Sequence, residues 1–155
     1  MNELVKKLNS IDQIGIVVKD LEKIKLEMKR IFGLDPVDNG IIRHKGVLYR
    51  GKPASCGVHI IHYDFFNIQI EFMAPVDGES IWKDFLDIHG NGLHHIRFNI
   101  SDHETVKKEM TDKGVETYQS GDSSHGAGIK FAYYDTEPTI GFIIETLNLS
   151  EIHGQ

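Results

Sequence analysis

The sequence is poor in cysteine, in clustered basic residues and in long apolar runs. Its single cysteine, Cys56, cannot form an internal disulfide or a multi-thiolate metal site, and it fits a reducing compartment. The longest apolar stretches have the length of strands, so we expect no signal peptide, no membrane span and a cytoplasmic location. A net charge of −6 argues against a general nucleic-acid binder.

What remains is an ordinary globular composition, with 40% hydrophobic and 26% charged residues over 155 positions. This length fills one hydrophobic core and is too short for two ordinary independent domains. We therefore expect one folded domain over residues 1–155, in which Cys56 is a small buried residue.

The segment from Ile11 to Phe32 has the pattern of a strand followed by a helix. Its apolar residues first alternate and then, after Asp20, recur at helical spacing. Asp20 can cap a helix by accepting hydrogen bonds from its free amides, and Gly33 can end one in the left-handed conformation. Both ends of this helix are therefore predicted from local residues.

The same pattern returns 82 residues later, where Asp102 takes the cap position and Gly114 closes the second helix. Each strand-helix unit is followed by extended stretches, in which Glu71 and Glu145 occupy matching places. A chance coincidence of two amphipathic strand-helix pairs is the alternative. Two copies of one unit explain the pattern more economically.

We therefore predict an α+β fold of two tandem βαβββ modules that form a cupped, open mixed sheet with helices on the outside. Module one covers about residues 10–74 and module two about residues 92–148. The connector, about residues 75–91, is expected to hold a short helix capped by Ser80.

Four polar residues are expected to share one surface of this sheet. Strand alternation turns Gln13 and His95 away from the residues that pack beneath the helices. Glu71 and Glu145 stand beside apolar neighbours, so both carboxylates are also expected to point away from the core. A pseudo-twofold axis would bring the four together, and their oxygen-rich donors suit a six-coordinate divalent ion. Unrelated solvent-facing glutamates and an incidental histidine are the alternative.

Four segments carry a family resemblance: Ile14–Leu21, Ile70–Pro75, Gly92–Ile96 and Gly141–Glu145. Together they resemble the vicinal oxygen chelate superfamily, which contains glyoxalase I, methylmalonyl-CoA epimerase, extradiol dioxygenases and bleomycin-resistance proteins. The Met-Ala-Pro turn, the following Gly-Glu-Ser-Ile segment and the double histidine look most like the methylmalonyl-CoA epimerase and glyoxalase I branch.

The resemblance implies one divalent metal ion (Co, Ni, Zn or Mn) held by Gln13, Glu71, His95 and Glu145. Epimerases usually have histidine at the first of these positions, but the set with glutamine resembles the ligands of eukaryotic glyoxalase I. Epimerases also generally carry a further glutamate upstream of the third strand, and Leu48–Ala54 contains no acid. One-base or altered chemistry is therefore favoured. Dioxygenases use two histidines and one carboxylate on iron, so Gln13 counts against them.

The chemistry shared by the two branches is proton abstraction next to a carbonyl, with the metal binding the oxygen that becomes an enolate. We expect a metal-dependent isomerase or lyase for a small acyl thioester or 2-oxo compound, with Glu145 as the base and Glu71 as its counterpart on the opposite face. The alternatives are a glyoxalase I-like lyase acting on a 2-oxoaldehyde-thiol adduct and a non-catalytic protein that sequesters a small molecule. A fosfomycin- or thiol-transferase-like enzyme fits less well.

Three further residues are predicted to bind substrate. Arg97 and Asn99 share the face of His95, and His125 lies in a polar, glycine-rich stretch typical of a loop at a cavity mouth. Arg50 and Lys52 are more simply interpreted as solvated surface charges. Many relatives are dimers, so a homodimer is expected, with no nucleic-acid or membrane partner.

Overall fold

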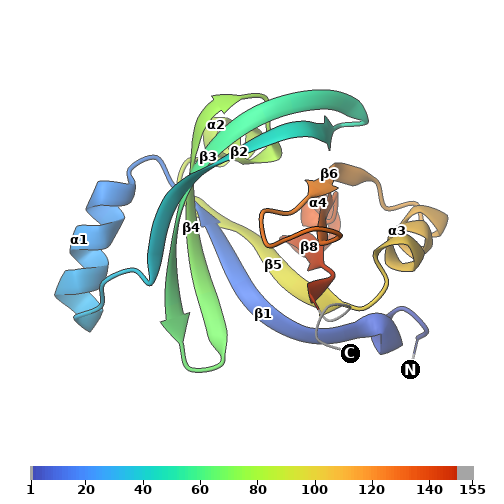
Figure 1. Ribbon diagram of the computed structural model, residues 1–155, viewed down its shortest axis with the longest axis horizontal. Helices are drawn as coiled ribbons and strands as arrows, with labels where there is room; N and C mark the ends of the chain where they lie inside the picture. The colour runs from blue at the N-terminus through green and yellow to red at the C-terminus, as the bar shows by residue number, and fades with distance from the viewer. Residues whose placement is uncertain (1, 150–155) are drawn as a thin grey trace.

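The computed structural model describes residues 2–149 and folds them into a ring of strands with helices outside (Figure 1). A short 3-10 turn at Val5–Lys7 leads into module one. Module one consists of β1 (Leu8–Val17), α1 (Leu21–Phe32), β2 (Asp38–Tyr49), β3 (Lys52–Phe65) and β4 (Ile68–Gly78). Helix α2 (Ile81–His89) connects the modules. Module two consists of β5 (Gly92–Ile100), α3 (His103–Asp112), β6 (Thr117–Asp122), β7 (Lys130–Tyr134), α4 (Glu137–Ile140) and β8 (Ile143–Leu147).

The predicted caps at the starts of α1 and α3 and at the end of α1 are confirmed, whereas α3 has Lys113 as its C-cap, one residue before the predicted Gly114. Asp20 accepts a hydrogen bond from the Lys23 amide at 3.1 Å, and Asp102 accepts one from the Thr105 amide at 3.0 Å. Gly33 ends α1 in the left-handed conformation, with φ of 70°. The one-turn helix α4 was not foreseen, because its four residues are too few to show helical periodicity.

The α+β fold class and the two tandem modules are confirmed, but the sheet is closed rather than open. The strands follow the order β1-β4-β3-β2-β6-β7-β8-β5, and β1 pairs with β5 antiparallel to join the modules. Within each module the first and last strands are parallel. The closure is a short ladder between β2 and β6, which pairs Leu48 with Ser120 and Tyr49 with Gln119. This pairing satisfies backbone groups that an open edge would expose.

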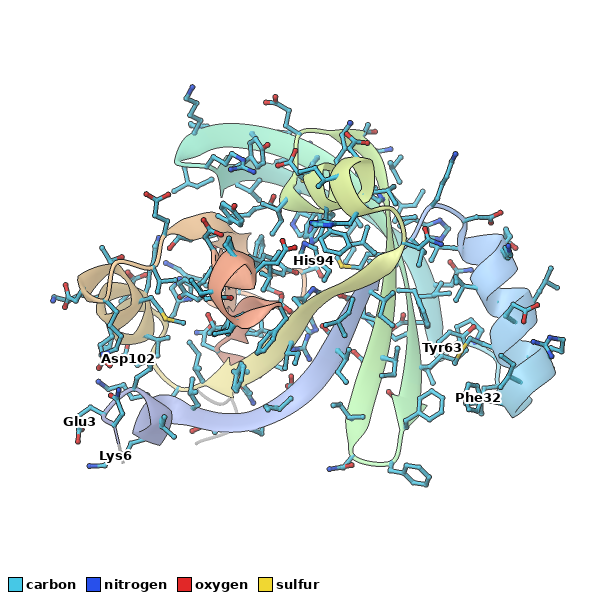
Figure 2. All side chains as sticks on the ribbon, turned by 180° about the vertical axis from the view of Figure 1, so that it is seen from behind. Glu3, Lys6, Phe32, Tyr63, His94 and Asp102 are labelled. Carbon is cyan, nitrogen blue, oxygen red and sulfur yellow. The ribbon has the colours of Figure 1, made fainter. Side chains whose placement is uncertain are left out.

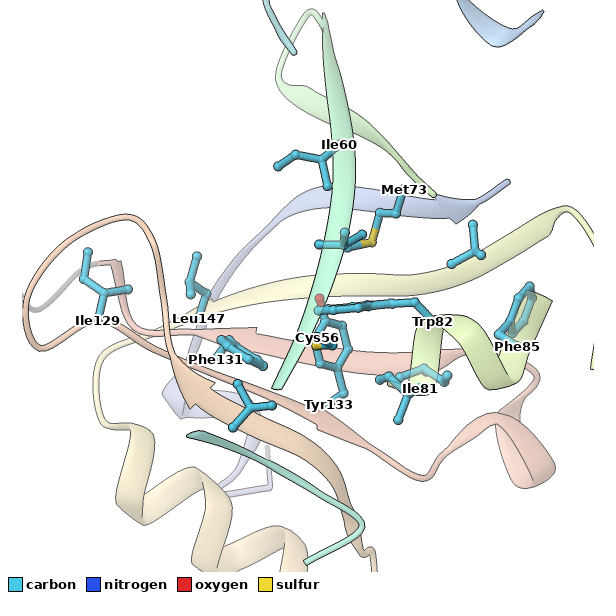
Figure 3. Packing of buried hydrophobic residues seen from close by; sticks show 14 residues of the cluster. Cys56, Ile60, Met73, Ile81, Trp82, Phe85, Ile129, Phe131, Tyr133 and Leu147 are labelled. Carbon is cyan, nitrogen blue, oxygen red and sulfur yellow. The ribbon is translucent and has the colours of Figure 1, made fainter. Parts of the chain in front are cut away.

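The ring separates two apolar layers, because successive strand residues face opposite sides. Val17 belongs to the cluster inside the ring, whereas Val18 packs beneath α1. The inner cluster includes Trp82 from α2, Phe131 and Tyr133 from β7, and the buried Cys56 (Figure 3). Cys56 is 3% exposed, as expected for a small buried residue.

The helices cover the ring on different sides. Tyr63 and Phe32 lie on the α1 side, and His94 lies beneath α2 near the centre of the molecule (Figure 2). Helix α3 covers a smaller cluster that contains Met110 and Tyr134. Between residues 2 and 149, no helix has both the length and the apolar character needed to span a membrane.

Candidate metal centre and cavity

The four predicted ligands come from the four central strands β1, β4, β5 and β8 of one chain. The strand register places Gly15 opposite both Glu71 and His95, and it places Arg97 opposite both Gln13 and Glu145. All four candidate ligands are buried, with exposures between 0% and 7%. Both glutamates were predicted to point away from the core, and this needs a correction. They do point away from the layers beneath the helices, but they point into the closed interior of the ring.

Three of these side chains converge on one nitrogen of the fourth, His95. Nε2 of His95 lies 3.1 Å from Oε2 of Glu145, 3.5 Å from Oε2 of Glu71 and 3.4 Å from Oε1 of Gln13. The amide of Gln13 also donates a hydrogen bond to Gln69 at 2.8 Å, so its oxygen is turned toward the histidine. These contacts bring a nitrogen donor and three oxygen donors together.

The His95 ring is held by its neighbours on both sides. A Cβ atom added to Gly15 would overlap the His95 ring, so the imidazole lies directly against the backbone of β1. Nδ1 of His95 lies 3.0 Å from Nδ1 of His94, and this contact directs Nε2 toward the carboxylates. Burial, followed by the proximity of His95, holds the pKa of His94 well below its usual range, so His94 is a neutral partner.

The donor chemistry fits a divalent ion: one imidazole, one amide oxygen and two carboxylates converge, and Oε2 of Glu145 has no hydrogen-bond partner among the described residues. The donor atoms contact one another instead of surrounding a common point. Accordingly, no group of three or more His, Cys, Asp or Glu in residues 2–149 is arranged to hold an ion with the side chains as they stand. Seating an ion at ordinary ligand distances of about 2.0–2.2 Å requires these side chains to turn outward.

His62 is a site residue that the sequence reasoning missed. It lies on β3 opposite Glu71, and its Nε2 is 2.8 Å from Oε1 of Glu71 while its Nδ1 is 2.7 Å from Oδ1 of Asp38. The signal was present, because His62 follows Val58 and Ile60 at the spacing of two that defines the inner face of the strand.

This contact sets the charge of both partners. Burial alone would raise the pKa of Glu71 and lower that of His62. Their hydrogen bond and opposite charges outweigh burial, so the pKa of Glu71 is lowered and the pKa of His62 is raised. Glu71 is therefore held as a carboxylate that accepts a hydrogen bond from His62.

Glu145 has a different cross-strand neighbour. Tyr133 on β7 stands opposite it, as His62 stands opposite Glu71. Burial, and then the charges of Glu145 and Glu71, hold the pKa of Tyr133 well above its usual range, so the phenol is neutral. The two modules thus place equivalent carboxylates in unequal surroundings.

A cavity of about 310 Å³ opens next to these groups, a size that accepts a small organic molecule. Gln13, Glu71 and Glu145 line it, whereas His95 lies behind them and is fully buried. The apolar part of the wall is formed by Ile41, Ile42, Val58, Ile60, Met73, Trp82, Phe131 and Leu147. The polar wall beyond the carboxylates includes Asp38, His62 and Arg97.

The three predicted substrate-binding residues occupy different places. Arg97 lines the cavity, is 6% exposed, and donates a hydrogen bond from Nε to Asp12 at 2.8 Å. His125 also lines it, in the loop after β6, where its Nδ1 lies 2.7 Å from the Ser123 hydroxyl. Asn99 is not part of the wall; it accepts a hydrogen bond from the Leu149 amide.

The segment that lacks an acid, Leu48–Ala54, spans the end of β2, the turn and the start of β3, and it contributes no residue to the cavity wall. Arg50 in this turn binds Asp84 at 3.1 Å and stacks on Tyr118, so it is a structural contact rather than a free surface charge. The acid that β2 does bring to the cavity is Asp38, ten residues before that segment.

Comparison with known proteins places these features in a family. The sequence model of the Glyoxalase/Bleomycin resistance protein/Dioxygenase superfamily matches residues 12–133, and the chain belongs to this superfamily. Its members commonly bind a divalent metal ion.

The chain is 22% identical over 138 residues to the uncharacterized protein YqjC of Bacillus subtilis, a match that covers 89% of this chain and 91% of the relative. Solved structures with the same fold include methylmalonyl-CoA epimerase from Mycobacterium tuberculosis, with a TM-score of 0.67, 20% identity, and 96% and 94% of the two chains covered. The hypothetical protein BH1468 from Bacillus halodurans has a TM-score of 0.70, 20% identity, and coverage of 92% and 95%. Another methylmalonyl-CoA epimerase structure, in complex with methylmalonyl-CoA and NH4+, has a TM-score of 0.67 at 19% identity and covers 92% and 96%.

Proposed function

We propose that this protein is a metal-dependent isomerase that removes a proton from a carbon next to a carbonyl group, as methylmalonyl-CoA epimerase does. The observation that carries the proposal is the pair of buried carboxylates, Glu71 and Glu145, which come from equivalent strands and face one cavity. Two such groups on opposite sides of a substrate carbon are what removal and return of a proton require.

Gln13, Glu71, His95 and Glu145 are the residues that would hold one divalent ion, of which Co, Ni, Zn and Mn are the candidates. When bound, such an ion stabilises the negative charge that develops on the carbonyl oxygen as the proton leaves. The two carboxylates match the charge of a divalent ion, and His94 fixes the direction of the His95 ring.

The unequal surroundings of the two carboxylates support different roles for them. Oε1 of Glu71 accepts a hydrogen bond from His62, which lowers the basicity of Glu71. Glu145 has no such histidine on the neighbouring strand, where Tyr133 stands opposite it, and its Oε2 lies 3.1 Å from Nε2 of His95. Glu145 is accordingly the base, and Glu71 is the counterpart on the opposite side.

A glyoxalase I-like lyase is the second candidate, and one observation favours it. The oxygen of Gln13 is directed at His95 by the hydrogen bond from its amide to Gln69, so glutamine acts as a positioned donor. A set of glutamine, histidine and two glutamates resembles the ligands of eukaryotic glyoxalase I. Both candidates share the proton abstraction by Glu145 and differ in the substrate.

The first test measures the metal content of the protein purified without chelator, beside His95→Ala. We expect about one divalent ion per chain in the wild type and loss of the ion in the variant. Absence of metal, together with no uptake of Co, Ni, Zn or Mn, would refute the proposal. Tight ligand binding by such metal-free protein would then identify a sequestering protein.

The second test follows the proton directly. Exchange of the hydrogen next to the carbonyl in methylmalonyl-CoA and in 2-oxo acids is measured by NMR in D2O, with wild type, Glu145→Gln and the exposed control Glu79→Gln. We expect Glu145→Gln to slow exchange by about 10²-fold or more with metal still bound, and the control to be unaffected. Full exchange activity in Glu145→Gln would show that the base is another residue.

The sequence further predicts a homodimer in the cytoplasm with a small-molecule substrate, and these three statements belong to the same proposal. The buried, unpaired thiol of Cys56 supports a reducing compartment. The four candidate ligands proposed above belong to one chain. Sedimentation analysis of the purified protein tests the oligomeric state.

A further inference from the structure

The cavity wall beside the candidate metal centre is strongly aromatic. The ring of His44 lies 5.6 Å from that of Trp82 and 5.4 Å from that of Phe131, measured between centroids. Tyr133 lies 5.8 Å from Trp82 and 5.7 Å from Phe131, nearly perpendicular to the former. Four rings from β2, α2 and β7 therefore form a continuous wall next to the carboxylates.

His44 presents an uncharged ring near neutral pH, because burial lowers its pKa. The remaining apolar lining is aliphatic and includes Ile60, Met73 and Leu147. Edge-to-face contacts of the kind these rings already make with one another favour a flat aromatic ligand.

The cavity offers little to a highly anionic ligand. Arg97 is the one Lys or Arg among the described residues that line it. Its guanidinium donates a hydrogen bond from Nε to Asp12 at 2.8 Å. The one Lys or Arg of the described lining is therefore already paired with a carboxylate.

We propose that the natural substrate carries an aromatic ring, which packs against His44, Trp82, Phe131 and Tyr133 while its carbonyl group faces Glu71 and Glu145. The substrate class is an aryl-substituted 2-oxo compound in which the acidic carbon lies between the ring and the carbonyl. This inference rests on the proposed proton abstraction and specifies the substrate for the same site.

The test compares ligands that differ only in the group next to the acidic carbon. Binding of phenylpyruvate, 4-methyl-2-oxopentanoate and pyruvate to the full chain is measured by calorimetry. We expect phenylpyruvate to bind about tenfold more tightly than the branched aliphatic acid. Equal affinity for these two acids would overturn the inference.

A matched pair of variants locates the ring. Phe131→Leu keeps an apolar side chain in the wall but removes an aromatic partner. Phe85→Leu makes the same change in the same buried cluster, away from the wall. We expect the phenyl preference to fall several-fold in Phe131→Leu and to persist in Phe85→Leu. Unchanged preference in Phe131→Leu, with folding verified by circular dichroism, would also overturn the inference.

Trp82 supplies an independent readout, because it is the only tryptophan in the chain and lines the cavity. Its fluorescence should change when 3-phenylpropionate binds and should not change with butyrate. Failure of the proposed function is distinguishable: a phenyl preference without any deuterium exchange would refute the proton abstraction alone. Exchange activity on 2-oxo acids without a phenyl preference would refute only the aromatic substrate.

Discussion

The imidazole of His95 occupies the space that a side chain at position 15 would need, because Gly15 lies directly opposite His95 on the paired strand. Gly15 has an extended backbone conformation that any residue can adopt, because its φ angle is not positive. What position 15 requires is therefore the absence of a Cβ atom. The backbone of β1 and the candidate metal ligand on β5 are fitted to each other.

This relationship predicts that Gly15→Ala displaces the His95 ring and weakens metal binding by about 10- to 100-fold, as loss of ligand orientation does elsewhere. Metal affinity is measured by competition with a chelator. The control is Gly92→Ala, because a Cβ there would make only ordinary van der Waals contacts with Phe85. Unchanged metal affinity in Gly15→Ala would show that His95 is not a ligand.

The contact of His62 with Glu71 predicts a loss of stability on His62→Ala. The buried carboxylate would lose its hydrogen bond, which costs about 1–3 kcal/mol in the free energy of unfolding. Urea denaturation measures this change. The control is His59→Ala on the same strand, whose imidazole binds Asn39 at the surface, and we expect a change within about 0.5 kcal/mol there.

The buried phenol of Tyr134 predicts a loss of stability in alkaline solution. Burial raises the pKa of Tyr134 to about 12, against about 10 in the unfolded chain. Because the folded pKa is the higher one, this stability is complete below about pH 10 and is lost as pH rises toward about 12. Two pK units correspond to roughly 2–3 kcal/mol. Between pH 9 and about 11.5, the unfolding free energy of Tyr134→Phe should fall less than that of the wild type. An equal fall in both proteins would contradict the raised pKa of Tyr134.

Arg50 predicts where the ring of strands opens. Its amide donates to the Tyr118 carbonyl at 2.7 Å, and its guanidinium stacks on Tyr118 and binds Asp84. The adjacent β2–β6 ladder has only two residue pairs. Arg50→Ala should therefore speed amide exchange at Tyr49 and in β6 while leaving β1 protected. The control is Arg43→Ala, which removes a salt bridge to Asp77 on the surface. If both variants change amide exchange in β6 equally, Arg50 does not hold the β2–β6 ladder together.

Much of the fold was predictable because its signals are local. Asp20 and Gly33 mark the ends of α1 through backbone hydrogen bonds within a few residues, and an aspartate cap recurs at the start of α3. Alternation along β1 and β5 placed Gln13 and His95 on one face, and the repeat related the modules. The resemblance to the superfamily could be recognised because it is carried by four short, local segments.

The site itself could be predicted only in part. The meeting of Gln13 and Glu71 with His95 follows from alternation and pseudo-symmetry, both of which are readable in sequence. His62 was missed because its contact with Glu71 depends on the pairing register of β3 with β4. Asn99 was assigned to the site because alternation gives the face of a residue but not its distance from the cavity.

The amino-acid sequence by itself determined the order of the elements, the helix ends and the shared face of the candidate ligands, because each depends on near neighbours or on a repeat. Tertiary structure decided the closure of the ring, the unequal partners of Glu71 and Glu145, and the aromatic wall around Trp82. These features depend on strand register and on the docking of α2, which bring together residues far apart in the chain. The free energy of that docking is spread over many weak contacts, so no short motif encodes it.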